Sequence, residues 1–423
     1  MPGKHVLSIL GRLLPAFALA FTFAGGAFAQ QQQPPLKIGF GMSLTGPLAG
    51  NGKAALISME IWKDDVNTKG GILGRKVEFV YYDDQTSPAT VPGLYTKLLD
   101  VDKVDLVVSG YGTAVIAPAM PLMMQRNLMF MTLFGLNVNS KFNYDRYFQI
   151  MPAGPEPAVG WTRGFFEAAM TMNPKPRTIA LVGADAEYPH LALEGARVHV
   201  KRLGLKVVYD KSYPPNTTDY SPIVRAIQAT NPDLVYLASY PPDSAGMVRA
   251  VNEVGLKTRM FGGGLVGPQF AALKTALGPL LNGVVNYELY TPELSGKFPF
   301  LEEFLKKYQA RAMKEGVDPL GYYLPPYAYA MMQVLDQAIT ATKGLDSAKL
   351  AEYMHTHTFD TFVGKVGFAK NGEWAEPRVM MVQYGGVKGN SIDQWKQPGI
   401  VTVLDPGPYK TGSVRAPFQD AKN

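Results

Sequence analysis

Residues 110–114 (Gly-Tyr-Gly-Thr-Ala) combine a hydroxyl, glycines and a predicted strand-to-helix turn, a combination that could hold an anion. They follow the apolar run 106–108, which predicts a buried strand. At such a turn the first N–H groups of the helix have no partner, and the helix dipole favours negative charge. We therefore expect Thr113 and the neighbouring backbone N–H groups to contact a carboxylate or carbonyl group of a ligand. The alternative is that Thr113 is an ordinary helix N-cap, a role that suits threonine.

The residue types that catalysis or a metal would need form no recognised pattern. The five histidines, at positions 5, 190, 199, 355 and 357, match no H-E-x-x-H motif. His355 and His357 have the spacing of two ligands on a strand, but no further ligands accompany them, and we expect a solvated pair. There is no G-x-S-x-G elbow, and the loop around 50–54 has Pro47 and Ala54 where a phosphate loop needs Gly and Ser or Thr. With cysteine absent as well, we expect no enzyme, no cofactor and no metal site.

Strand-like and helix-like stretches alternate along the chain in two series. The strand-like runs of the first series are residues 36–41, 77–82, 104–108 and 128–131, and those of the second are 178–182, 206–209, 233–237 and 259–262. The helix-like segments include residues 116–125, 191–203, 222–230 and 244–254. Repeated strand–helix–strand units predict a parallel sheet in each series, with a ligand cleft at the carboxyl ends of the strands. The Pro- and Gly-rich residues 151–157 separate the two series.

The C-terminal third changes character near residues 284–290. Two long helix-like segments follow, at 298–315 and 323–343. The tail predicts short antiparallel strands, 364–368 and 379–384, joined through the turn Lys370-Asn371-Gly372.

The first 29 residues have the features of an export signal. Lys4 and Arg12 are basic, residues 13–23 are apolar but too short to span a membrane comfortably, and Ala27-Phe28-Ala29 is a small-x-small cleavage pattern. A buried N-terminal helix is the alternative, but the Gln- and Pro-rich residues 30–35 cannot continue it. We predict cleavage near Ala29 and a soluble, exported chain.

The charge balance argues against nucleic acid as a partner. The chain has 41 basic and 35 acidic residues; without the two in the signal, 39 basic residues remain, and they are spread without a Lys/Arg block. A chain of this length without disulfides must be stabilised by its core, and about 390 residues suffice for two large lobes.

Short motifs with a fixed order carry a family resemblance. They are Lys37-Ile38-Gly39, Leu44-Thr45-Gly46-Pro47, residues 67–74 (Asn-Thr-Lys-Gly-Gly-Ile-Leu-Gly), Tyr82-Asp83-Asp84, residues 110–118, Asp219-Tyr220-Ser221, and residues 364–368 before Asn371-Gly372. Together, from about Leu36 to Tyr384, the chain resembles the periplasmic Leu/Ile/Val-binding proteins, which are type I solute receptors of ABC importers. The resemblance implies an α/β fold of two lobes, each a parallel sheet flanked by helices, joined by three crossings. It divides the chain into a signal peptide (1–29), lobe 1 (36–152 plus 286–358) and lobe 2 (153–285 plus 359–423).

The resemblance also implies a set of ligand contacts. Thr113 would bind the ligand carboxylate, and aromatic cleft positions are matched by the three tyrosines at 188, 240 and 323. The full set is Asn51, Tyr111, Thr113, Ala114, Phe134, Gly135, Leu136, Tyr188, Tyr240, Gly264 and Tyr323. Alternatives stay open: core packing for Phe134, helix packing for Tyr323, surface roles for Tyr188 and Tyr240, and a turn for Asn51.

Two departures from the family pattern concern polar anchors. Gly264 occupies the place where amino-acid-binding members carry an acidic residue for the ligand ammonium, and no acidic residue lies between Met260 and Lys274. Leu136 stands where a second carboxylate-binding hydroxyl is usual. Because a buried ammonium without a counter-charge is costly, an ordinary α-amino acid is disfavoured as the ligand.

A third departure concerns a disulfide. Thr86 and Gly112 stand where the family usually has a disulfide; both partners are missing, so no orphan thiol remains.

These features lead to one hypothesis and several alternatives. We expect a monomeric periplasmic substrate-binding protein that closes two lobes over a small organic carboxylate lacking the α-amino group, for which an aromatic acid is one candidate. Its partners would be that small molecule and inner-membrane ABC permease subunits, with no nucleic acid. The alternatives are a branched-chain amino acid or a short amide such as urea as ligand, a sensor for a regulatory system, or an enzyme on the same scaffold.

Overall fold

A computed structural model describes residue 3 and residues 33–422 of the chain. The predicted signal, residues 1–29, therefore lies outside the described residues apart from Gly3. Pro34–Asn423 is one compact unit, and the description below concerns this unit.

The first sheet has five parallel strands in the order β2-β1-β3-β4-β5. They are β1 (Leu36–Met42), β2 (Val77–Asp83), β3 (Leu106–Tyr111), β4 (Phe130–Leu133) and β5 (Tyr147–Gln149). Ile38 of β1 lies opposite both Phe79 and Leu106, which fixes the register of the central strands. The strands β3 and β4 are buried along their whole length because helices cover both faces of the sheet. Helices on this side are α1 (Ala49–Thr68), α2 (Val91–Asp100), α3 (Thr113–Ile116), α4 (Met120–Gln125) and α5 (Asn139–Phe142).

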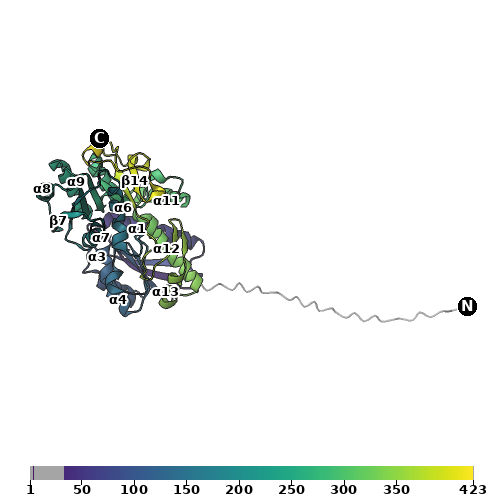
Figure 1. Ribbon diagram of the computed structural model, residues 1–423. Coiled ribbons are helices and arrows are strands. Elements are labelled where there is room, and N and C mark those ends of the chain that lie inside the picture. Colours follow the sequence, from purple (N-terminus) through teal and green to yellow (C-terminus); the bar gives the residue numbers. More distant parts are fainter. Residues whose placement is uncertain (1–2, 4–32, 423) are drawn as a thin grey trace. The chain divides into compact units, whose positions relative to one another are not determined.

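The second sheet has seven strands in the order β14-β13-β10-β9-β8-β6-β7. Five are parallel: β6 (Thr178–Ala184), β7 (Lys206–Tyr213), β8 (Leu234–Ser239), β9 (Met260–Leu265) and β10 (Val285–Glu288). Of the other two, β13 (Met380–Tyr384) runs antiparallel to β10, and β14 (Val401–Asp405) pairs antiparallel with β13 and so has the same direction as the five. Its helices are α6 (Pro157–Ala169), α7 (Glu187–Leu203), α8 (Ser221–Ala229), α9 (Pro241–Val254) and α10 (Ala271–Leu277). Figure 1 shows α8 and α9 beside this sheet, away from α4 and α13 on the side of the first sheet.

Most sequence-predicted elements are confirmed, with ends shifted by a few residues. All eight predicted parallel strands form, and α7, α8 and α9 occupy the expected segments. The predicted helix 116–125 is broken into α3, a 3₁₀ turn at Ala117–Ala119 and α4, because Pro118 and Pro121 interrupt the backbone hydrogen bonding. Strands β5, β10 and β14, together with the short strand β11 (Phe359–Thr361), were not predicted from the sequence. Because β10 belongs to the second sheet, that sheet reaches Glu288; the lobe boundaries themselves stay a prediction.

The predicted segments 364–368 and 379–384 both form antiparallel strands, but the prediction that the turn joins them as a pair is wrong. The first segment forms β12 (Gly364–Val366), which pairs with β11 (Phe359–Thr361), and the second forms β13 in the large sheet. The turn at Asn371-Gly372 closes only an isolated bridge between Phe368 and Trp374. β13 is buried along its whole length and pairs with β10 on one side and β14 on the other.

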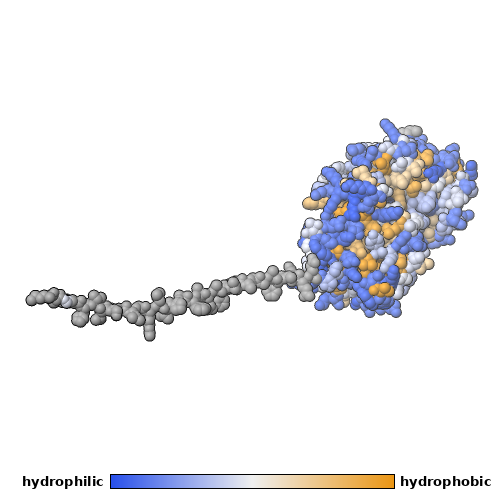
Figure 2. Space-filling model, turned by 180° about the vertical axis from the view of Figure 1, so that it is seen from behind, coloured by the Kyte–Doolittle hydropathy of each residue, from blue (hydrophilic) through white to orange (hydrophobic). Residues whose placement is uncertain are grey.

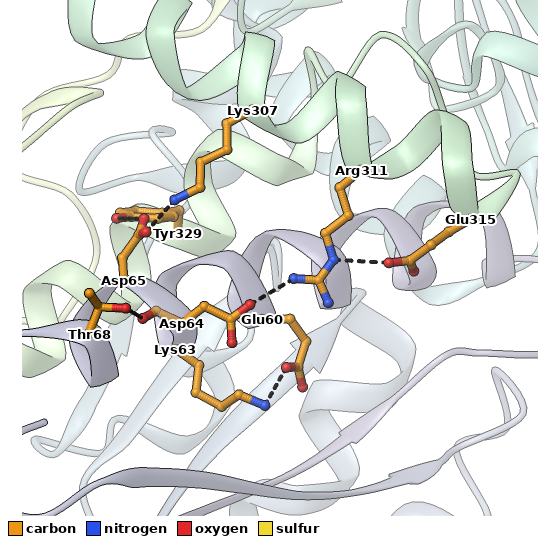
Figure 3. A network of polar contacts seen from close by, with 9 residues as sticks. All are labelled: Glu60, Lys63, Asp64, Asp65, Thr68, Lys307, Arg311, Glu315 and Tyr329. Atoms are coloured by element: carbon orange, nitrogen blue, oxygen red, sulfur yellow. Dashed lines mark hydrogen bonds and ion pairs between the residues drawn. The ribbon is translucent and has the colours of Figure 1, made fainter.

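Two long helices follow β10 and pack on the first sheet's helix α1. They are α11 (Pro299–Glu315) and α12 (Leu324–Thr342), and α13 (Ser347–Thr356) packs on α12. Figure 3 shows Lys307 and Arg311 of α11 reaching Asp65 and Asp64 of α1, while the Tyr329 hydroxyl of α12 donates to Asp65 at 2.9 Å. The Arg311 Nη1 to Asp64 Oδ2 distance is 3.1 Å. Such exposed pairs add little stability singly, but here they tie three helices together.

The face of the molecule drawn in Figure 2 is mainly polar. Figure 2 shows a mostly hydrophilic face with apolar residues dispersed among the polar ones. Among the described residues, no helix combines the length and the apolar character needed to cross a bilayer.

Candidate ligand-binding site

A small cavity lies where carboxyl ends of strands from both sheets come together. It measures about 20 Å³, which is room for one or two water molecules. Tyr111 ends β3 and Phe134 follows β4, whereas Tyr188 and Tyr240 follow β6 and β8 of the second sheet. The lining residues are Tyr111, Gly112, Thr113, Phe134, Leu136, Met151, Trp161, Tyr188, Tyr240, Val266 and Tyr323. This is the edge at which α/β sheets bind ligands.

Seven of the eleven sequence-predicted site residues line this cavity. They are Tyr111, Thr113, Phe134, Leu136, Tyr188, Tyr240 and Tyr323. The other four, Asn51, Ala114, Gly135 and Gly264, lie behind the lining. Asn51 is buried in α1 beside Tyr111, and its side-chain Nδ2 has no hydrogen-bond partner among the described residues. The Gly135 carbonyl accepts a bond from Gln149 Nε2 at 2.9 Å, which stabilises the loop after β4.

Thr113 is the first residue of α3 rather than its N-cap. The N-cap is Gly112, which adopts φ 114° and makes no side-chain cap, a conformation that favours glycine. The Thr113 hydroxyl accepts a hydrogen bond from the Leu136 N–H at 3.0 Å, so its own proton points away from Leu136 and can be donated to another group. The backbone N–H groups of Thr113 and Ala114 donate no hydrogen bond to the described residues. This end of the cavity therefore offers a hydroxyl and backbone donors to an acceptor group.

Phe134 forms the wall beside these donors in a strained conformation. Its φ of 58° is unusual for a bulky residue. The Phe134 N–H donates to Gln149 Oε1 at 2.9 Å, and this bond holds the backbone in place. The ring meets Tyr323 edge-on with a centroid distance of 5.3 Å. Strain that is held by the surrounding structure is typical of functional sites.

Tyr111 and Tyr323 contact each other through their hydroxyls and their rings. The hydroxyls of Tyr111 and Tyr323 are 3.2 Å apart, and their rings pack edge-to-face at 6.0 Å. Burial raises the pKa of Tyr111 to about 12, although the neighbouring Tyr323 hydroxyl and Asn51 side chain act in the opposite direction. Both groups are therefore neutral at physiological pH and act as hydrogen-bonding hydroxyls.

On the second-sheet side, Tyr188 has both its hydrogen-bonding roles filled. Its hydroxyl accepts from Trp161 Nε1 at 3.3 Å and donates to the Gly264 carbonyl at 3.0 Å. The Tyr240 hydroxyl, by contrast, is buried without a hydrogen-bond partner among the described residues. A buried, unpaired hydroxyl costs about 1–3 kcal/mol, which a ligand acceptor would recover.

Tyr236 on the neighbouring strand leaves no room for a side chain at position 264. A Cβ at Gly264 would lie 2.9 Å from the Tyr236 hydroxyl, and one at Gly263 would lie 2.4 Å from the Tyr236 ring. Tyr236 is fully buried and thus fills the space that a residue 264 side chain would need. No other residue supplies the acidic group that is absent at position 264, since no acidic side chain lines the cavity.

Sequence reasoning missed four lining residues: Gly112, Met151, Trp161 and Val266. Val266 directly follows β9, and Met151 follows β5, so the rule that strand ends carry the site could have found both. Trp161 has no such signal. It comes from α6, and its ring lies between Phe134 (6.4 Å) and Tyr287 (4.4 Å), so only the tertiary fold brings it to the cavity.

The chemistry of the lining is neutral and aromatic. No Asp, Glu, Lys, Arg or His lines the cavity, and the described residues contain no cluster of three or more potential metal ligands. His355 and His357 stand at the end of α13 rather than on a strand, far along the chain from the cavity residues. The arrangement can bind an acceptor at the Thr113 end and an apolar or aromatic body between the rings.

The sequence is similar to those of known periplasmic binding proteins. The profile of a family described as periplasmic binding protein matches residues 35–389. An amino acid binding protein from Pseudomonas aeruginosa is 26% identical over 313 residues, covering 73% of this chain and 79% of that protein. The Leu/Ile/Val-binding protein of Escherichia coli K12 is 23% identical over 372 residues, covering 87% and 94%.

Solved structures share the fold at low sequence identity. A putative branched-chain amino acid ABC transporter protein from Silicibacter pomeroyi superimposes with a TM-score of 0.73 at 19% identity, covering 91% of this chain and all of that one. A solute-binding protein of an ABC transporter from R. palustris, in complex with 4-hydroxybenzoate, gives a TM-score of 0.69 at 20% identity, covering 85% and 95%. The neighbours are two-lobed α/β proteins, in agreement with the predicted fold class.

Proposed function

The chain belongs to the periplasmic binding protein family, and we propose that it binds a small organic carboxylate lacking an α-amino group. Members of this family bind solutes for ABC transporters and are not enzymes. The observation that carries the proposal is the distribution of polar groups around the cavity. Donors without partners gather at Thr113, aromatic rings form the walls, and no charged side chain lines the space.

The Thr113 end suits a carboxylate. The threonine hydroxyl proton and the unpaired N–H groups of Thr113 and Ala114 are three donors of the kind that stabilise carboxylates through charge-assisted hydrogen bonds. A carboxylate that accepts two or three such bonds stays ionised without a cationic partner.

The opposite end does not suit an ammonium group. The polar atoms there are the phenol of Tyr240, the Tyr188 hydroxyl, which is already fully bonded, and the carbonyl that this hydroxyl occupies. An ammonium buried among them would lack a counter-charge and would cost several kcal/mol. A phenolic or apolar end of the ligand fits this environment, which agrees with the 4-hydroxybenzoate bound by the R. palustris neighbour.

Binding would be coupled to lobe closure. The cavity walls come from both sheets, and Lys141 of α5 pairs with Glu187 of α7 at 2.8 Å across the two sides. With a cavity of about 20 Å³, a ring-sized ligand can enter only if the walls first move apart. A ligand that contacts both sides then favours the closed arrangement by its differential affinity.

The biological setting follows from family membership and the predicted signal. We propose export to the periplasm with cleavage near Ala29, a monomeric receptor, and delivery of the ligand to inner-membrane ABC permease subunits. A branched-chain amino acid or a short amide as the ligand would appear as an outcome of the experiments below.

A ligand screen with two matched variants tests the proposal. The melting temperature of the protein is measured with benzoates, phenylalkanoates, aliphatic acids, amino acids and short amides. We expect stabilisation by an organic acid, at least tenfold weaker binding in Thr113→Val, and near-normal binding in Thr113→Ser, which keeps the hydroxyl. Stabilisation by leucine or valine alone would overturn the ligand class while leaving the receptor function in place.

A further inference from the structure

A second cavity, separate from the first, lies between α11, α12 and the strand β13. It also measures about 20 Å³, and it shares no lining residue with the first. Its lining residues are Leu289, Phe298, Leu301, Tyr327, Val363, Arg378, Met380 and Tyr409. Seven of these are apolar or aromatic, and the eighth, Arg378, is a permanent cation.

Arg378 reaches this cavity without a carboxylate partner. Among the described residues, no Asp or Glu oxygen lies within ion-pair distance of its guanidinium, and no acidic residue lines the cavity. The side chain is half-buried. A partly desolvated cation without a counter-charge is costly, and its N–H donors need acceptors.

The guanidinium is held in place by neighbours that do not neutralise it. It lies over the Trp374 ring at 4.9 Å from the centroid. On another side it abuts Gly364, where a Cβ would lie 2.7 Å from Nη1, and where φ is +99°. The Tyr327 hydroxyl lies beside it, and the charge of Arg378 opposes the rise that burial causes in the pKa of Tyr327. The fold thus builds a fixed pocket around one cation.

A second cation lies at the rim. Lys297 Nζ is 5.7 Å from the centroid of the Tyr409 ring, and that ring also packs against Phe298 at 5.7 Å. Both rings line the cavity. Because the lining contains one cation and no acidic side chain, the potential inside the cavity favours a negative ion.

We propose that this cavity binds a small monoatomic anion, of which chloride is the prototype. The volume admits one or two particles of the size of water, which excludes benzoate-like and phosphate-like anions unless the walls move. The guanidinium N–H groups and the Tyr327 hydroxyl donate to the ion. The Tyr327 ring also contacts Phe134 of the first cavity at 5.3 Å between centroids, so the ion stabilises a wall residue of the ligand site.

Halide titration with two arginine variants tests the site. The melting temperature is measured while sodium gluconate is exchanged for sodium chloride or bromide at constant ionic strength, for wild type, Arg378→Gln and Arg225→Gln. Arg225 is an exposed α8 residue that serves as the matched control. We expect a saturable rise in wild type and in the control, and at least a tenfold loss of halide affinity in Arg378→Gln.

A bromide-soaked crystal of the wild-type protein gives an answer that does not depend on a variant folding. An anomalous peak beside Arg378 supports the proposal. The absence of that peak, or a halide response that is linear and equal in all three proteins, would overturn it. A saturable response to acetate or sulfate without one to halide would contradict the size argument.

Discussion

Asp243 offers a sharp test of how burial controls stability near the ligand site. It lies in the first turn of α9, three residues after Tyr240, and is 5% exposed. Burial raises its pKa to about 6 from the ordinary 3.8, although the Tyr213 hydroxyl donates a hydrogen bond of 2.6 Å to Oδ2. The groups that face it, Tyr213 and Tyr220, are neutral phenols. No cation therefore offsets the cost of ionising it.

The sign and magnitude of the effect follow from linkage. An acid whose pKa is raised on folding binds its proton more tightly in the folded state, so stability is lost as pH rises from about 4 through 6. The difference between about 6 and 3.8 corresponds to about 3 kcal/mol above pH 7. Asp243→Asn cannot ionise but still offers an oxygen to Tyr213. We expect it to be up to about 3 kcal/mol more stable than wild type at pH 7.5, and within about 1 kcal/mol at pH 4.

Thermal melts at several pH values measure this difference. For a unit of about 390 residues the entropy of unfolding is on the order of 0.8 kcal/mol/K, so 3 kcal/mol corresponds to about 4 °C. Asp145→Asn, at an exposed position, is the control and should show no pH-dependent gain. If Asp243→Asn were less stable than wild type at pH 7.5, the hydrogen bond from Tyr213 would outweigh burial and the reasoning would be refuted.

Two further predictions concern a buried carboxyl and a close contact. Glu373 is 2% exposed, neither carboxyl oxygen has a partner among the described residues, and burial raises its pKa well above 4.5. Glu373→Gln should therefore be more stable than wild type at pH 7, and this gain should disappear below pH 4, as measured by urea denaturation. A loss of stability at pH 7 would show that the carboxyl has a stabilising role. A Cβ at Gly50 would lie 2.5 Å from the Phe270 ring, whereas one at Gly93 would meet nothing within 4 Å; Gly50→Ala should weaken ligand binding about tenfold by straining the closed state, and Gly93→Ala should leave affinity unchanged. Equal affinities in the two variants would argue that Gly50 and Phe270 do not limit closure.

The fold was largely predictable because its signals are local. Short apolar runs predict the buried strands, and Gly or Asn-Pro residues mark the ends of the helices. The eight parallel strands predicted in this way are present in the structure. The partner of a strand is not a local property. Residues 364–368 and 379–384 flank a good turn sequence, yet β13 pairs with β10, about a hundred residues away, because burial of both its faces outweighs the turn preference.

The candidate site was predictable to the extent that it follows strand ends. Tyr111, Phe134 and Tyr240 come directly after or at the ends of strands, and the structure gathers them around one cavity. Trp161 projects from the middle of a helix, so its place depends on how α6 packs on the second sheet and on α7. The role of Tyr236 in filling the space at Gly264 was equally hidden, because it depends on packing between neighbouring strands.

The central claim is that the site accepts a carboxylate and rejects an α-ammonium group. Titration calorimetry with ligand pairs that differ only in that group tests it most directly: 3-phenylpropanoate against phenylalanine, and 4-methylpentanoate against leucine. Because an unpaired buried ammonium costs several kcal/mol, the acid of whichever pair binds should be at least 100-fold tighter than its amino acid. An amino acid that binds as tightly as its matched acid, or more tightly, would contradict the account.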